Sequence, residues 1–260
     1  MTKLEFVSIK IRNLLLLKQE DLRSFHLEKD YRNHVDKVRR LQLGVRGAGA
    51  LCDYFVRMQE KDDRFYYAMD VDDRSRLRNV FWADARSRFT CEYFGDGITF
   101  DTTYLTNPYK MSFAPFVGMN HHGQSTLLEC GLISNKNVET FVWLFKSWMK
   151  CMLGRAPKAI ITDQDQAMKR VIEIVFLKTK HRFCLWYIKK KIPKKFKGHS
   201  QYGAIKRDIE RSVYNSLSRD KFKNNWQRLL EVHNLQDNEW LQWLYYERHH
   251  WIPTYVKNTF

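Results

Sequence analysis

Two aspartates, Asp101 and Asp163, are the residues of this 260-residue sequence best suited to chemistry. They stand 62 positions apart (163 − 101), and each follows a run of β-branched or aromatic residues typical of a buried strand. A carboxylate beside a buried strand is costly unless a cation or hydrogen-bond donors compensate it. On neighbouring strands, the pair could hold divalent ions against the attacking and leaving oxygens of a phosphodiester. From spacing alone, capping of a following helix by Asp163 or Asp165 is an equally good interpretation.

The residues around Asp101 predict three antiparallel strands. Three runs rich in β-branched and aromatic residues, separated by Asn-Pro and His-Gly turn signals, cover residues 98–104, 112–120 and 125–134. An amphipathic helix over 137–152 then leads to a fourth apolar run that ends at Asp163. A strand reached through such a crossover normally lies parallel to an earlier strand. We therefore expect Asp163 beside the first strand, next to Asp101.

The residues before this meander predict further helices and strands. We expect helices over 50–60 and 83–94 and a hairpin of strands at 64–70 and 77–82. Gly44, Gly47 and Gly49 indicate a linker ahead of them. The carboxylates in this part, Asp72, Asp73 and Asp84, have the placement of turn formers and a helix N-cap rather than of metal ligands.

The composition favours a polyanionic partner. Lys plus Arg number 45 and Asp plus Glu 29, which gives a net charge of +16 and a pI of about 9.6. Nucleic acid is the commonest partner for such an excess, and a solvated basic surface is the alternative. Five scattered cysteines are typical of a reducing compartment. No apolar run is long enough for a membrane span, so we expect no membrane partner.

The character of the sequence changes near residue 188. From there to residue 260 the apolar spacing is helical, which predicts an all-helical insertion. Trp186, Tyr187 and Phe196 are aromatic residues that could stack on bases, and the lysines among and after them are candidate phosphate contacts. These lysines are Lys189, Lys190, Lys191, Lys194, Lys195 and Lys197. A solvated helix end and a nuclear-import signal are the alternatives.

The histidines are weaker candidates. His181 and Cys184 have H-x-x-C spacing, but zinc would need two further ligands, so a structural pair at the sheet edge is favoured. His121-His122 either lean over the carboxylates or form a plain turn. His249-His250 are expected on a solvated helix face.

Several longer stretches resemble one family. They are residues 81–88, 99–107 (Thr-Phe-Asp-Thr-Thr-Tyr-Leu-Thr-Asn), 115–124, 156–165, 181–186 and 251–257. These stretches are similar to the Mutator-type transposase core, and more specifically to its domesticated plant descendants, the far-red-impaired-response family of transcription regulators. The resemblance runs from about Lys29 to Phe260.

The resemblance implies an α/β fold with a ribonuclease-H-like mixed sheet and a C-terminal all-helical insertion. Asp101 and Asp163 would be the first two acids of a transposase triad that holds Mg²⁺ when catalytic. The resemblance also implies a nuclear, DNA-binding protein that regulates transcription in light signalling and development, as dimers or mixed oligomers with family members.

The sequence departs from the family pattern in ways that bear on catalysis. The family's third acid follows the helical insertion and would lie beyond Phe260, and Glu231, Glu239 and Glu247 are poor substitutes for it. Tyr187 stands where the family has histidine, and Glu129 stands where it has a small residue. The family's zinc-binding domains are expected to be absent from this chain.

We therefore predict three parts: a helical or linker segment over 1–60, a transposase-derived core over 61–187 and a helical insertion over 188–260. The favoured function is a truncated, non-catalytic transcription regulator that binds DNA or family partners. The alternatives are a Mg²⁺-dependent Mutator-type transposase and an interaction module that dimerises with full-length relatives. Two acids without a third would hold metal poorly, which ranks the enzyme last.

Overall fold

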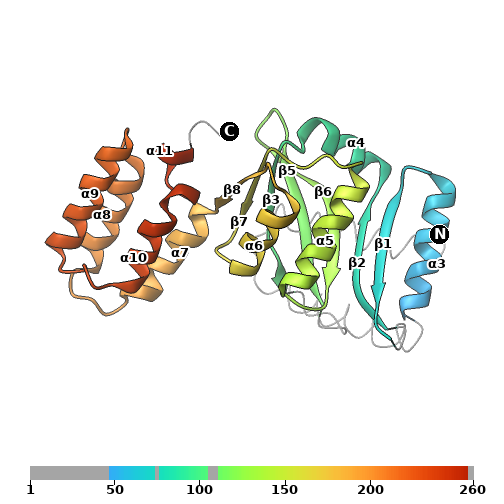
Figure 1. Ribbon diagram of the computed structural model, residues 1–260, viewed down its shortest axis with the longest axis horizontal. Helices are drawn as coiled ribbons and strands as arrows, with labels where there is room; N and C mark the ends of the chain where they lie inside the picture. Colours follow the sequence, from blue (N-terminus) through green and yellow to red (C-terminus); the bar gives the residue numbers. More distant parts are fainter. Residues whose placement is uncertain (1–46, 74–75, 105–110, 257–260) are drawn as a thin grey trace, which may run out of the picture.

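A computed structural model describes residues 47–73, 76–104 and 111–256. It has two lobes, a sheet flanked by helices and a group of helices that is joined to it through the last strand (Figure 1). Most of the expected N-terminal segment, including Gly44 of the expected linker, lies outside the described residues. Gly47 and Gly49, also expected in that linker, instead belong to a helix.

The sheet is mixed, as the sequence predicts for an α/β fold. Seven of its eight strands follow the order β1-β2-β6-β5-β3-β7-β8, and β4 pairs with β5. The strands are β1 (Tyr66–Val71), β2 (Leu77–Ala83), β3 (Gly97–Phe100), β4 (Thr103–Tyr104), β5 (Ser112–Met119), β6 (Ser125–Ile133), β7 (Ala159–Thr162) and β8 (Lys180–Phe183). The expected meander is β3, β5 and β6, and β7 lies parallel to β3 and to β8.

Three helices of the sheet lobe begin where the sequence supplies a capping side chain. The helices of the described residues are α3 (Gly47–Lys61), α4 (Ala85–Phe94), α5 (Val138–Cys151), α6 (Gln166–Val175), α7 (Leu185–Phe196), α8 (Tyr202–Tyr214), α9 (Arg219–Val232), α10 (Glu239–Tyr246), the 3₁₀ helix η1 (Glu247–His250) and α11 (Pro253–Val256). Asp84, Asn137 and Asp165 each accept a backbone N–H three residues ahead, at the starts of α4, α5 and α6. Asp165 rather than Asp163 thus caps α6, which leaves the Asp163 carboxylate for another role.

The main core lies between the sheet and the helices α4, α5 and α6. Phe100, Phe116 and Trp148 are almost fully buried there, and the Phe116 ring lies 4.7 Å from the rings of both Phe100 and Trp148. Side chains alternate along a strand, so the strand neighbours of Phe100 and Phe116 point to the opposite face of the sheet. On that face, Phe55 of α3 packs against Val80 of β2.

The helical lobe has a core of its own, built from α7 to α11. Ile188, Ile192 and Phe196 form the buried row of α7, so Phe196 is unavailable for stacking on a base. The buried apolar residues of α8 are Ile205, Ile209 and Val213. Helix α7 begins at Leu185, two residues after the end of β8, with Cys184 at its N-cap position.

Glu129 is an acid inside the main core. It is 1% exposed, and neither of its carboxylate oxygens has a hydrogen-bond partner. Burial raises the pKa of Glu129 to about 8, and the nearby Cys91 thiol and Arg88 guanidinium offset only part of that rise. The side chain is therefore predominantly protonated at neutral pH, which removes the cost of a buried charge.

We expect Glu129 to make the protein less stable as pH rises. The folded chain holds this proton from about pH 4.5 to about pH 8 while the unfolded chain releases it, so the free energy of unfolding falls across that window. The limiting slope is about 1.4 kcal/mol per pH unit for one group. Glu129→Gln should flatten this dependence in urea unfolding at pH 5, 6, 7 and 8. Glu92→Gln, on the exposed side of α4, is the matched control, and parallel curves for wild type and Glu129→Gln would contradict the expectation.

Candidate acid-pair site

The parallel pairing of β3 and β7 brings the two aspartates to one edge of the sheet. Ile98 pairs with Ile160, an offset of 62 residues (160 − 98). The same offset separates Asp101 from Asp163, and each follows the last residue of its strand. Because the carboxyl ends of parallel strands meet at the same edge, the two residues are direct neighbours across the strands.

The first strand of the meander is interrupted at Asp101, between β3 and β4. The β3–β5 register pairs Phe100 with Phe116 and the β4–β5 register pairs Thr103 with Phe113, so Asp101 falls opposite Pro115 (both pairs sum to 216). Proline has no N–H to offer the ladder. The interruption between β3 and β4 therefore coincides with the position that carries the carboxylate.

The aspartates leave the sheet on the face away from α5 and α6. Phe100 and Thr162, which precede them, are buried at 0% and 1% exposure. Side chains alternate along a strand, so Asp101 and Asp163 follow the opposite direction, and both are only partly buried.

A tyrosine from the helical lobe reaches Asp101. The backbone N–H of Cys184, the residue before α7, donates to Thr162 O at 2.7 Å, which fixes the start of α7 beside the end of β7. Tyr187, in the first turn of α7, then donates its hydroxyl proton to Asp101 Oδ2. Burial and this hydrogen bond raise the pKa of Tyr187 above its usual range. Tyr187 is consequently a neutral donor that satisfies one oxygen of Asp101.

Asp163 is compensated from a different side. Burial raises its pKa, the backbone N–H of Asp165 (3.1 Å to Oδ1) lowers it, and the negative charge of Asp101 raises it further. Lys191, one turn after Tyr187, lowers the pKa of Asp163 through its charge and donates from Nζ to Gln164 Oε1 at 2.6 Å. Tyr187 and Lys191 thus form one row of α7 that faces the two acids.

The residues present do not fit a two-metal centre. Within the described ranges, no group of three or more His, Cys, Asp or Glu side chains is placed to hold a metal ion. Magnesium needs octahedral oxygen ligation, and two ions need carboxylates that bridge them. Here two carboxylates already accept hydrogen bonds, and the charge of Lys191 opposes a divalent cation beside Asp163.

Comparison with known proteins places this site in a recognised domain. Residues 97–191, from the start of β3 into α7, match the MULE transposase domain, and the match includes both aspartates, Tyr187 and Lys191. This chain carries a MULE transposase domain. It is also homologous over most of its length to FAR1-related plant proteins.

The relatives are all much longer than this chain. Protein FAR-RED IMPAIRED RESPONSE 1 of Arabidopsis thaliana is 39% identical over 238 residues, which is 90% of this chain and 28% of the relative. Protein FAR1-RELATED SEQUENCE 6 of the same plant is 38% identical over 90% of this chain and 33% of its own length. Protein FAR1-RELATED SEQUENCE 7, from the same plant, is 36% identical over 89% of this chain and 30% of its own length. The chain therefore spans about a third of the relatives it matches.

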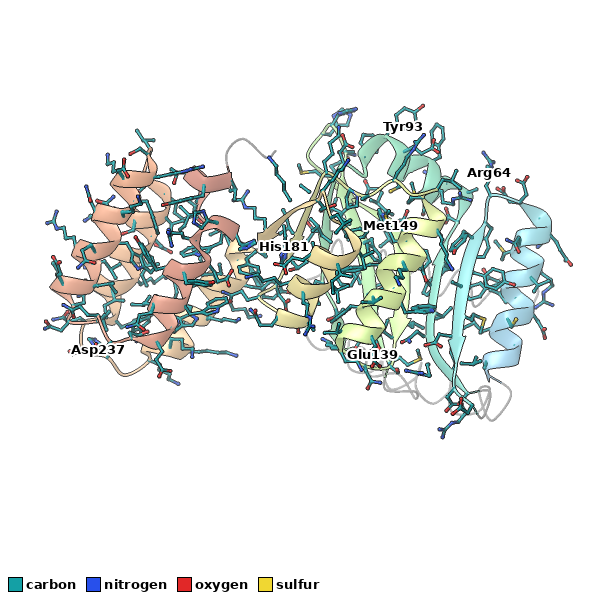
Figure 2. The ribbon with its side chains drawn as sticks, viewed as in Figure 1. Arg64, Tyr93, Glu139, Met149, His181 and Asp237 are labelled. Atoms are coloured by element: carbon teal, nitrogen blue, oxygen red, sulfur yellow. The ribbon has the colours of Figure 1, made fainter. Side chains whose placement is uncertain are left out.

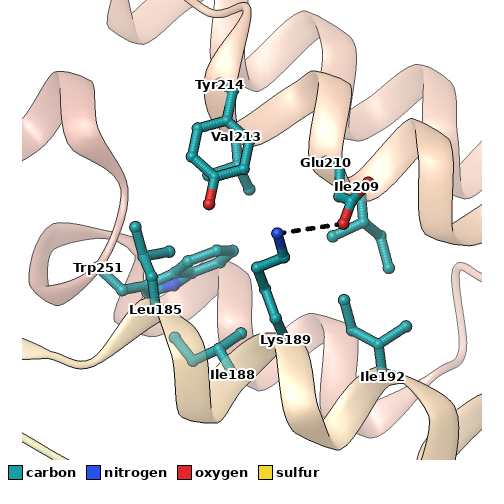
Figure 3. Close-up of a pocket in the computed structure, with 9 residues that line it drawn as sticks. All are labelled: Leu185, Ile188, Lys189, Ile192, Ile209, Glu210, Val213, Tyr214 and Trp251. Atoms are coloured by element: carbon teal, nitrogen blue, oxygen red, sulfur yellow. Dashed lines mark ion pairs between the residues drawn. The ribbon is translucent and has the colours of Figure 1, made fainter. Parts of the chain in front are cut away.

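The six lysines predicted to contact phosphate lie in different surroundings. Lys189 forms an ion pair with Glu210 of α8 at 3.3 Å, so it is tied to the helical lobe, as Figure 3 shows. Lys191 faces the acids. Lys190 lies over the ring of Trp186, at 4.6 Å from its centroid. The remaining three, Lys194, Lys195 and Lys197, are exposed.

Glu247, weighed in the sequence as a substitute acid, has a different partner. Its carboxylate is buried and accepts from Lys169 Nζ of α6 at 2.7 and 2.9 Å. His250 also departs from expectation, since it packs against the rings of His181 and Phe183 instead of lying on a solvated face. These contacts join the helical lobe to the MULE domain, and His181 lies between the two lobes in Figure 2. No local sequence pattern predicts these contacts, because Lys169 and Glu247 are 78 residues apart.

The other histidines that the sequence singled out, His181, His121 and His122, make structural contacts or form a turn. His181 Nε2 lies 2.8 Å from Thr162 Oγ1, and burial lowers the pKa of His181 to about 3. This agrees with a structural residue on the edge strand β8. His121 and His122 form the turn after β5, at the end of the sheet opposite Asp101, with the His121 ring packed against Phe94.

Replacing Asp101 should lower the pKa of Asp163. The negative charge of Asp101 helps to hold that pKa up, so Asp101→Asn removes one cause of the shift while burial remains. Titration of the Asp163 carboxyl by ¹³C NMR measures the change directly. Asp96→Asn, at the opposite end of β3, is the control and should leave the titration unchanged. An unaltered Asp163 pKa in Asp101→Asn would mean that the two carboxyls do not interact.

Proposed function

We propose that this chain is a transposase-derived nuclear regulator of transcription whose core binds DNA without cleaving it. Homology to the FAR1-related proteins and the MULE domain support a transposase-derived origin. The net charge of +16 and the exposed lysines of α7 support a DNA partner and, as a basic run, nuclear import. Partnership with family members in dimers or mixed oligomers remains part of the proposal.

We assign the sheet to the ribonuclease-H-like class within this proposal. Its support is the strand order β6-β5-β3-β7-β8, in which an antiparallel meander is extended by two parallel strands. The aspartates at the ends of β3 and β7 occupy the centre of that arrangement. None of the helices in the described residues is long and apolar enough to span a membrane.

The observation that carries the non-catalytic proposal is the row of α7 that faces the acids. Tyr187 donates to Asp101, and Lys191 places a positive charge beside Asp163. A divalent ion at Asp101 Oδ2 would compete with the Tyr187 hydroxyl, and the positive charge of Lys191 would repel an ion beside Asp163. The chain's own groups thereby satisfy carboxylates that would otherwise need a cation.

Removal of the Tyr187 hydroxyl should therefore expose the acids to metal. We expect Tyr187→Phe to bind Mn²⁺ at least about tenfold more tightly than wild type, since the loss of a charge-assisted hydrogen bond worth roughly 1.5–3 kcal/mol frees a carboxylate oxygen. Mn²⁺ titration followed by electron paramagnetic resonance gives the affinities. Tyr246→Phe, an exposed tyrosine of α10, is the control, and Asp101→Asn should abolish the gain. Equal Mn²⁺ affinity in wild type and Tyr187→Phe would refute the blocking role.

DNA binding should depend on lysines and salt, and the acids should not contribute to it. We expect Lys190→Ala/Lys194→Ala to weaken binding to random duplex and to lower the salt slope by about one unit per lost phosphate contact. Lys178→Ala/Lys180→Ala, exposed lysines before and at the start of β8, form the matched control. Asp101→Asn should leave the DNA affinity largely intact, because a carboxylate repels phosphate and its neutralisation removes no favourable contact.

Two results would overturn this proposal. Strand nicking with Mg²⁺ or Mn²⁺ that disappears in Asp101→Asn would establish the transposase alternative. The absence of duplex binding at both low and moderate salt would favour the alternative in which the chain is an interaction module for longer relatives.

A further inference from the structure

We propose that Trp186 is a stacking site for an unpaired nucleobase, placed next to the acid pair. The inference rests on the proposed DNA-binding function and extends it to a specific contact. It predicts that this chain prefers DNA with unpaired bases, such as a frayed end or a fork, over blunt duplex.

The exposure of Trp186 sets it apart from the other tryptophans. It is 58% exposed, whereas the other seven are buried or partly buried. Exposing an indole to water forgoes one of the largest apolar contributions available to a core or an interface. Of the three aromatic residues that the sequence offered for stacking, Phe196 is buried and Tyr187 is engaged with Asp101. Of these three residues, only Trp186 has a ring that is both exposed and free of a hydrogen bond to the acids.

The surroundings of Trp186 suit a base rather than an apolar protein segment. Lys190 Nζ lies over the ring at 4.6 Å from the centroid, and Lys194 follows one turn later on the same side of α7. Trp186, Lys190 and Lys194 therefore form a row of one aromatic ring and two cations, which is the combination that single-stranded nucleic acid uses for base stacking and phosphate contact. An apolar partner would have to desolvate both lysines.

The row of Trp186, Lys190 and Lys194 is also connected to the acid pair through Tyr187. The Trp186 ring packs edge-on against Tyr187, with 4.9 Å between ring centroids and an angle of 80° between the rings. Tyr187 in turn bonds to Asp101. One aromatic ring thus separates the stacking site from the first acid, so a base held on Trp186 would place its strand alongside the end of β3.

The test measures binding of the full chain to three DNAs: a blunt duplex, a fork with unpaired thymines, and the same fork with abasic sites in place of those thymines. Wild type should bind the fork about tenfold more tightly than the abasic fork, since stacking is lost with the base. Trp186→Ala should bind both forks equally, because it has no ring on which the unpaired base can stack. Trp186→Phe should keep part of the preference. Tyr246→Ala, which removes another exposed ring, should behave as wild type.

The outcomes separate this inference from the function on which it rests. Salt-sensitive binding to blunt duplex together with equal fork preference in wild type and Trp186→Ala would overturn the stacking site and leave the DNA-binding proposal intact. No binding of wild type to any of the three DNAs would overturn both. Circular dichroism melting of Trp186→Ala confirms that the variant is folded, as expected for an exposed position.

Discussion

The site depends on one constraint, the register between β3 and β7. Their parallel pairing has an offset of 62 residues, which equals the spacing of the two aspartates, so the carboxyl ends of the strands place both acids at one edge. A slip of one residue would send one of the side chains to the face covered by α5 and α6. That register is held by buried residues on either side of it, including Ile98, Phe100 and Ile160, and cannot slip without burying polar groups.

Two negative groups at one edge would repel each other, and helix α7 resolves the conflict. Its start is tied to β7 by the Cys184–Thr162 backbone hydrogen bond, and its first two turns supply Tyr187 and Lys191 to the acids. The same helix buries Ile188 and Ile192 in the helical lobe and presents Trp186 to solvent. Helix α7 is thus the element through which lobe packing, acid compensation and the proposed DNA surface are linked.

Much of the sheet could be predicted because its signals are local. Turn residues separate the meander strands, and Asp101 and Asp163 end apolar runs in the sequence. The contacts that decide the chemistry are not local. Whether Tyr187 reaches Asp101 depends on where β8 stops and α7 starts, and the unbroken apolar run from Phe183 to Ile188 does not mark that point. The Lys169–Glu247 pair likewise depends on how two lobes pack. At Gly47 and Gly49, packing of α3 on β1 and β2 overrides the low helix propensity of glycine.

The central claim is that this chain satisfies its acid pair with its own side chains instead of with metal ions. A crystal structure of the wild-type chain soaked in Mn²⁺, with anomalous difference density measured at the ends of β3 and β7, tests it most directly. We predict a Tyr187 hydroxyl still bonded to Asp101 and no Mn²⁺ peak between the two carboxylates. A Mn²⁺ peak bridging Asp101 and Asp163, with Tyr187 displaced, would contradict the claim.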